Sequence, residues 1–158
     1  MHVYLVQHGE AKAEAEDPER PLTERGREEV QRVARHAALL GLPLAEIVHS
    51  GKLRARQTAE IMADNLWPSR GLREMAAMAP NDDPAAARAE LEGAQGSMML
   101  VGHLPHLGRL ASSLLVGDPG REIIRFRTGA IVCLARAERL WRLHWILAPE
   151  LLSARVSA

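Results

Sequence analysis

The chain is poor in several residue types that mark particular protein classes. Its 158 residues include one cysteine, one tyrosine, one phenylalanine and three tryptophans. A single cysteine excludes an intrachain disulfide framework, and we expect Cys133, inside the apolar run 130–135, to be a small buried strand residue. No apolar run approaches the roughly 20 residues of a membrane helix, and no secretory leader pattern opens the chain. We therefore expect a cytoplasmic protein without a membrane partner.

Charge of one sign is not in excess either. Lys and Arg number 20, Asp and Glu also number 20, and the formal net charge is +0. This balance argues against a general nucleic-acid partner. The chain is 47% apolar and 25% charged, as in ordinary globular proteins. Its length predicts a single domain over residues 1–158.

Strand-like and helix-like stretches alternate along the chain. The predicted strands are 2–7, 47–48, 98–101 and a hairpin of 130–135 with 141–147. The predicted helices are 24–40, 53–66, 84–93 and 107–116. Residues 11–22, 67–84 and 117–127 read as loops, and 151–158 as a frayed end. This alternation predicts an α/β fold, a three-layer α/β/α sandwich with a mostly parallel sheet.

Two histidines follow predicted parallel strands. His8 ends the apolar run 3–6 and precedes Gly9, and His103 repeats this arrangement after residues 98–102. Open α/β sheets place their ligands at the carboxyl ends of the strands. We therefore expect the two imidazoles to face each other across one crevice, an arrangement suited to phosphoryl chemistry.

Four segments extend this pattern in a fixed order. They are QHGE at 7–10, PLTERG at 21–26, SGKLRARQTA at 50–59 and VGH at 101–103. Together they resemble the histidine phosphatase superfamily, whose fold is shared by phosphoglycerate mutases and acid phosphatases. The short length, with RPLT at 20–23 and FRTGA at 126–130, resembles the small bacterial branch typified by the phosphohistidine phosphatase SixA.

The resemblance implies a role for each matching residue. His8 would be the nucleophile that forms a covalent phosphohistidine, with its second ring nitrogen donating to a backbone carbonyl. Arg54, at a helix N-terminus, would bind the phosphate. His103, if protonated, would add positive charge. Gly9 would let the backbone approach closely, and the Leu104 N–H would add a donor. No metal or other cofactor is required.

Gln7 departs from the family, which has arginine before the nucleophile. Glutamine keeps an N–H donor but loses the charge and the planar fork, a loss of roughly 1–2 kcal/mol of phosphate binding. Arg20 is our candidate to restore the charge, with Lys12, Arg109 and Arg127 as alternatives.

The general acid of the larger branches has no clear match. Glu74, Asp82 and Asp83 lie in the right stretch, but their default interpretation is a solvated loop. An alkoxide leaving group needs such an acid, whereas the imidazole of phosphohistidine, with a pKa near ~6.5, leaves readily once protonated. The absence therefore favours a phosphohistidine substrate.

The remaining histidines give weaker indications of function. A metal pair of His103 and His106 is disfavoured by the intervening proline and the lack of carboxylate or cysteine partners, and we expect His106 to line the mouth of the site. His2 and His144 read as structural or exposed residues.

Three functions are left open. The favoured one is dephosphorylation of phosphohistidine on a partner protein, such as a phosphorelay or phosphotransfer domain. A second is a phosphate- or phosphoprotein-binding module, catalytically weakened by Gln7. A third is a small-molecule phosphomonoesterase or mutase, although the compact chain leaves little sequence for a lid over a metabolite.

Overall fold

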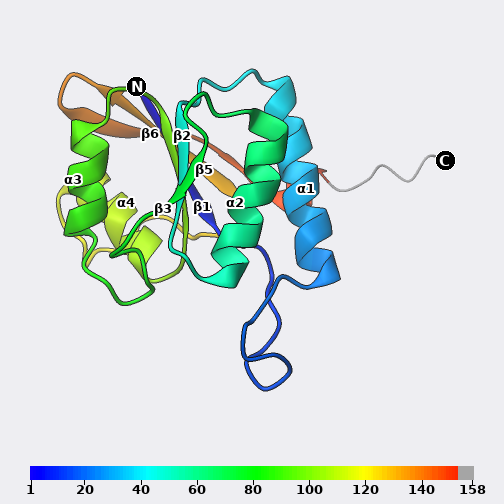
Figure 1. Cartoon of the computed structure of the whole chain (residues 1–158). Helices are drawn as coiled ribbons and strands as arrows, with labels where there is room; N and C mark the ends of the chain where they lie inside the picture. The colour runs from blue at the N-terminus through cyan, green and yellow to red at the C-terminus, as the bar shows by residue number, and fades with distance from the viewer. Residues whose placement is uncertain (153–158) are drawn as a thin grey trace.

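The computed structural model describes residues 1–152 and contains one six-stranded sheet with helices on both faces (Figure 1). The strands are β1 His2–Gln7, β2 Glu46–His49, β3 Leu72–Glu74, β4 Met98–Gly102, β5 Ile131–Ala137 and β6 Leu140–Leu147. The helices are α1 Glu24–Leu39, α2 Leu53–Leu66, α3 Ala85–Gly93, α4 His106–Val116 and the short 3-10 helix η1 Pro149–Leu152. The prediction of one domain over 1–158 extends beyond the described residues.

The sheet is mostly parallel, as predicted. Its strand order is β3-β2-β4-β1-β5-β6. Strands β3, β2, β4 and β1 pair in parallel, whereas β5 runs antiparallel to both β1 and β6. In the register of β1 with β4, Gln7 lies opposite Gly102. The next residues, His8 and His103, therefore leave the sheet side by side.

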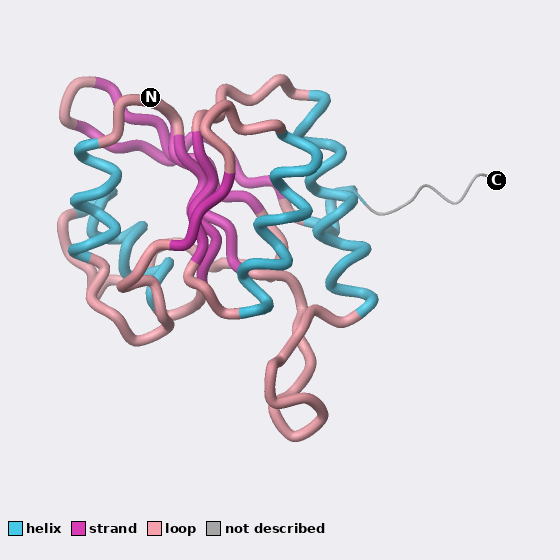
Figure 2. The backbone as a smooth tube through the Cα atoms, viewed as in Figure 1, coloured by secondary structure: helices cyan, strands magenta, loops and turns pink. Residues whose placement is uncertain are grey.

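The layers follow from burial of both faces of β1. Val3 and Leu5 belong to the core beneath α3 and α4, and Tyr4 and Val6 to the core beneath α1 and α2. Figures 1 and 2 show the two helix pairs on opposite sides of the strands. The predicted three-layer α/β/α sandwich is confirmed. No helix of residues 1–152 is long and apolar enough to cross a membrane.

Two segments differ from their sequence predictions. Residues 67–84 were predicted to be loop but contain β3, whose three residues pair with β2 and are too few to show a strand period. Residues 151–152, predicted to be frayed, end the 3-10 helix η1. The rest of the predicted frayed end, residues 153–158, lies outside the described part.

The start of α1 is bound to the segment that follows the first strand. Thr23 is the N-cap, and its hydroxyl oxygen accepts a hydrogen bond from the Gly26 amide at 2.9 Å. The same hydroxyl lies 2.9 Å from the Glu10 carboxylate and donates to it. Gly26 packs so tightly that an added Cβ would lie 2.9 Å from the Glu10 amide nitrogen and closer still to its carbonyl oxygen.

We expect Gly26→Ala to destabilise the fold by roughly 1–3 kcal/mol, because the new methyl must displace backbone rather than a flexible side chain. Gly93→Ala is the matched control, since its Cβ would meet nothing within 4 Å and alanine favours a helix over glycine. Urea denaturation of the three proteins measures both effects. Equal stability of Gly26→Ala and the parent would contradict the packing described.

Candidate active site

His8 lies immediately beyond β1, with each ring nitrogen engaged. Its Nδ1 is 2.7 Å from the Gly9 carbonyl oxygen and donates to it, which confirms the backbone hydrogen bond expected from the sequence. Its Nε2 accepts from the Arg54 Nε at 3.3 Å. The lone pair on the nitrogen that would attack phosphorus therefore points toward a guanidinium.

Burial keeps this imidazole neutral. It lowers the pKa of His8 to about 4, the Gly9 carbonyl opposes that shift, and the positive charges of Arg54 and Arg20 add to it. At neutral pH the ring is thus unprotonated and nucleophilic.

His103 faces His8 as the strand-end pattern predicts. The two ring centroids are 5.1 Å apart, with the planes at 53°. His103 is 1% exposed, and its Nε2 lies 2.6 Å from the Ser50 hydroxyl. Burial, then the neighbouring charges of His8 and Arg54, lower the pKa of His103 to about 3. At neutral pH, His103 is therefore unprotonated in the free site and does not carry the positive charge considered in the sequence analysis.

Arg54 is the second residue of α2 and is buried. Thr58, one turn later, connects this helix to the strand end. Its hydroxyl donates to the Arg54 carbonyl at 2.8 Å and accepts from the Gly9 amide at 3.0 Å. A Cβ on Gly9 would lie 2.7 Å from the Val30 side chain. Gly9 thus holds His8 through its carbonyl, and its own N–H is already occupied.

Arg20 is the candidate cation that the structure brings to the site. It lies at the end of the loop 11–22, which extends beyond the lower end of the sheet in Figure 1. Its Nε donates to the Lys12 carbonyl at 3.1 Å. Its charge lowers the pKa of both His8 and Arg54.

The other cations considered have different neighbours. Arg127 forms an ion pair with Glu150 at 3.2 Å. Arg109 donates to the Asp82 carbonyl at 3.5 Å. Lys52, which sequence reasoning did not single out, immediately precedes α2 and contributes to the lowered pKa of His103.

The structure also adds polar groups to which the sequence analysis gave no role. Ser50 contacts His103, and the Gln57 side-chain oxygen accepts from the Leu22 amide at 2.8 Å. With Thr58, both lie inside the motif at 50–59. The motif could therefore have singled out these three residues, but it could not show which groups each of them contacts.

The three carboxylates considered as general acids lie in different surroundings. Glu74 ends β3, and its carboxylate borders the Ser50–Gly51 turn, because a Cβ on Gly51 would lie 2.5 Å from its Oε1. Asp82 and Asp83 accept hydrogen bonds from the amides of Ala79 and Ala85 at 2.8 and 2.9 Å. Glu74 is thus the one beside the turn that supports His103, and the other two organise local turns.

His106 does not line the mouth of the site, so that prediction was wrong. Its side chain is fully buried. It begins α4, where the helix turns it into the protein. Leu104, 40% accessible, and Pro105 are instead the exposed residues of this segment.

The family model of the histidine phosphatase superfamily (branch 1) matches residues 3–98. The chain belongs to this superfamily. An uncharacterised protein from a Picosynechococcus species is 35% identical over 148 residues, covering 89% of this chain and 88% of the relative. The phosphohistidine phosphatase SixA of Escherichia coli is 29% identical over 143 residues, 87% of each chain.

A solved structure agrees with this assignment. The structure of the protein histidine phosphatase SixA complexed with tungstate superposes with a TM-score of 0.84 at 28% identity. The match covers 97% of this chain and 100% of the SixA chain. The resemblance to the SixA-like branch and the phosphoglycerate mutase-like fold are both confirmed.

We expect the His8 imidazole to titrate with a midpoint near pH 4. Since the pKa is lowered, the neutral nucleophilic form persists as the pH falls from 7 to 5 and is lost only as it passes through about 4. Long-range 1H–15N NMR correlations of the histidine rings measure this directly. Assignment comes from His8→Ala, and a His8 midpoint near ~6.5 would contradict the electrostatics described.

Proposed function

We propose that this superfamily member is a phosphatase that forms a covalent phosphohistidine on His8 and acts on phosphohistidine in a partner protein. One observation carries the proposal. The His8 ring is held neutral, with Nδ1 on the Gly9 carbonyl and Nε2 directed at the Arg54 guanidinium. A nucleophilic nitrogen therefore lies beside the group best suited to hold a phosphoryl oxygen.

The reaction has two steps. In the first, His8 Nε2 forms a bond to phosphorus as the bond to the leaving nitrogen breaks. That nitrogen keeps the electron pair of the broken bond, and the leaving imidazole departs neutral because its other ring nitrogen already carries a proton. In the second, water attacks phosphorus, His8 Nε2 leaves, and orthophosphate is released. Arg54 and the amide groups at the start of α2 stabilise the charge on the equatorial oxygens.

His103 takes part through its change of charge. A phosphoryl dianion near the two rings favours their protonated forms, which raises the pKa of both histidines above their values in the free site. The Ser50 contact orients the His103 ring for that role. Gln7 supplies a neutral donor and Arg20 further positive charge, and the Leu104 N–H completes the proposed phosphate contacts.

The proposed chemistry needs no metal. In residues 1–152, the one group of three His, Cys, Asp or Glu ligand atoms close enough to share an ion lies elsewhere, on β1, β5 and β6. Arginine and histidine side chains supply the positive charge instead.

The substrate class rests on the leaving group and on the relatives. Imidazole leaves as a weak base and needs no strong carboxylic acid, in keeping with a site whose nearest candidate acid, Glu74, is exposed. The similar Escherichia coli chain is named a phosphohistidine phosphatase. Phosphotransfer or phosphorelay domains are therefore the proposed partners.

We expect His8→Ala to lower turnover of a phosphohistidine protein and of an aryl phosphate by at least about a thousandfold, because the covalent step is lost. The measurement is phosphate release, with acid-quenched trapping of labelled phosphoenzyme in the parent. His36→Ala, a half-buried histidine in the last turn of α1, is the matched control. Undiminished turnover in His8→Ala would overturn the mechanism, and rapid hydrolysis of alkyl phosphates with rejection of phosphohistidine would favour a small-molecule phosphomonoesterase.

Gln7 favours a second candidate, a phosphate-binding module with little turnover. We expect Gln7→Arg to raise kcat/KM by roughly 5- to 30-fold, since it adds a charged hydrogen bond worth about 1–2 kcal/mol. Arg20→Gln should lower it in both the parent and the variant. A parent that binds tungstate without releasing phosphate from any substrate, and becomes active only in Gln7→Arg, would establish the binding module.

A further inference from the structure

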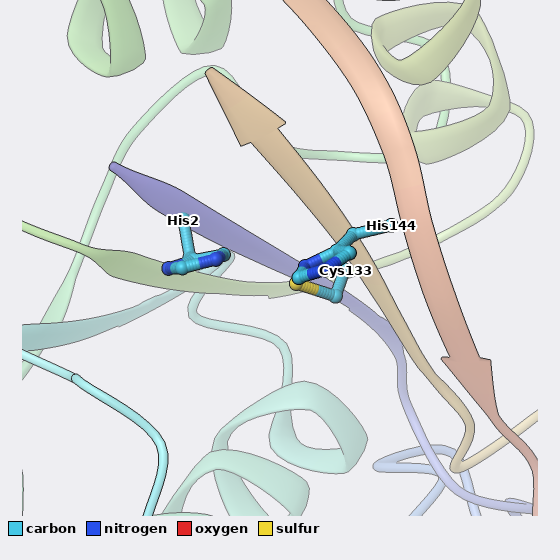
Figure 3. A group of neighbouring side chains, drawn as sticks. All are labelled: His2, Cys133 and His144. Atoms are coloured by element: carbon cyan, nitrogen blue, oxygen red, sulfur yellow. The ribbon is translucent and has the colours of Figure 1, made fainter. Parts of the chain in front are cut away.

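A second cluster of reactive side chains lies away from the phosphatase site. His2 on β1, Cys133 on β5 and His144 on β6 come together on three adjacent strands (Figure 3). A ring nitrogen of each histidine and the Cys133 sulfur all lie within 4.8 Å of one another. The Cys133 side chain is buried, His2 is half-buried and His144 is exposed, so the cluster is open to solvent on one side.

A β-bulge creates this arrangement. In the pairing of β5 with β6, Cys133 lies opposite Trp145 but the next residue lies opposite Leu143, so His144 is the extra residue. Consecutive residues of a regular strand point to opposite faces. Here, however, the His144 ring stacks on His2 and the Trp145 ring contacts Tyr4, and His2 and Tyr4 share one face of β1. The bulge thus turns His144 toward the buried thiol.

The ring geometry fits coordination of one ion. The centroids of His2 and His144 are 5.4 Å apart, with the planes within 14° of each other. Two imidazoles bound at Zn–N distances of about 2.0–2.1 Å in a tetrahedral site have centroids separated by roughly 5 Å. The three ligand atoms lie within 4.8 Å of one another, so coordination would require side-chain rotations that bring them to the closer spacing of a tetrahedron.

The chemistry of the donors selects a transition-metal ion. A thiolate with two neutral imidazoles suits Zn²⁺, whereas Ca²⁺ and Mg²⁺ prefer oxygen ligands. Burial lowers the pKa of His2 and raises the pKa of Cys133 to about 11. The imidazole is therefore ready to bind, and the thiol is deprotonated only when the metal arrives. Within residues 1–152, the three side chains form no hydrogen bond that coordination would have to break.

We propose that His2, Cys133 and His144 form a Zn²⁺-binding site that is separate from the phosphatase site. On binding, the Cys133 thiol releases one proton to solvent and becomes a thiolate ligand, the two neutral imidazoles donate their lone pairs, and a water molecule takes the fourth position. The metal would join the edge strand β6 to β1 across β5. Since His2 and His8 lie at opposite ends of β1, roughly 20 Å apart, we expect it to stabilise the sheet without entering the reaction.

Cobalt tests the site in the chain of 158 residues, because Co²⁺ bound to thiolate absorbs in the near ultraviolet. Cys133 is the one cysteine in the sequence, so the band reports this cluster and not the His8–His103 pair. We expect chelator-treated protein to develop the band with one equivalent of Co²⁺ and to lose it when Zn²⁺ is added. Absence of the band at stoichiometric Co²⁺ would overturn the proposal.

Variants locate the histidine ligands. His144→Ala changes an exposed side chain, so the fold should persist, and phosphate release by this variant checks that it does. We expect it to weaken Zn²⁺ binding at least about 10-fold, since loss even of an outer-shell partner costs roughly 10- to 100-fold in metal affinity. His36→Ala should bind as the parent does. Equal Zn²⁺ affinity of His144→Ala and the parent in a chelator competition would contradict the ligand set.

Thermal denaturation supplies a readout independent of the spectra. Zn²⁺ should raise the Tm of the parent and of His36→Ala increasingly as its concentration exceeds the Kd, and should raise the Tm of His144→Ala and Cys133→Ser less at the same concentration. It should not alter phosphate release by the parent. An equal Tm shift in all four proteins would place the metal elsewhere and exclude the proposed site.

Discussion

The parallel pairing of β1 with β4 is the constraint on which the proposed phosphatase site depends. Gln7 lies opposite Gly102, and the His8 amide continues the ladder by donating to the Gly102 carbonyl at 3.1 Å. A slip of one residue would reverse the faces of every β1 side chain and separate the two imidazoles. Both faces of β1 are buried under helices, so the hydrophobic effect fixes this register more firmly than any polar contact at the site does.

Once the register is set, the helices complete the site from both sides of the sheet. Helix α2 carries Arg54 to His8 and is connected to the strand end through Thr58. Helix α4 begins just after His103 on the other side. Within residues 1–152, two histidines and a guanidinium thus share one place without a carboxylate in hydrogen-bond contact with them. The lowered histidine pKa values follow first from burial and then from the neighbouring positive charges. In the proposed function, a phosphate dianion would supply the missing negative charge.

The sequence predicted the parts of this arrangement that depend on periodicity and order. Apolar runs ending at His8 and His103 indicated adjacent strand ends, and the motif at 50–59 placed Arg54 near a helix start. What it could not predict depends on side-chain direction. The charge state of His103 follows from its burial near cations. Its contact with Ser50 depends on the side-chain rotamers of the two residues. The burial of His106 follows from its place in the first turn of α4. Strand β3 was not predicted, because three residues are too few to show the alternating pattern of a strand.

The same limit explains why the cluster at the other end of β1 is not visible in the sequence. His2, Cys133 and His144 are far apart in the chain, and regular alternation does not predict that two consecutive residues such as His144 and Trp145 face the same side. Only a bulge changes that parity, and bulges are set by tertiary packing rather than by a local motif. A strand buried on both faces leaves its ends as the places where polar side chains meet solvent. In β1, the proposed phosphate site lies at the carboxyl end and the proposed metal site at the amino end. The buried core between them separates the two, so we expect them to act independently.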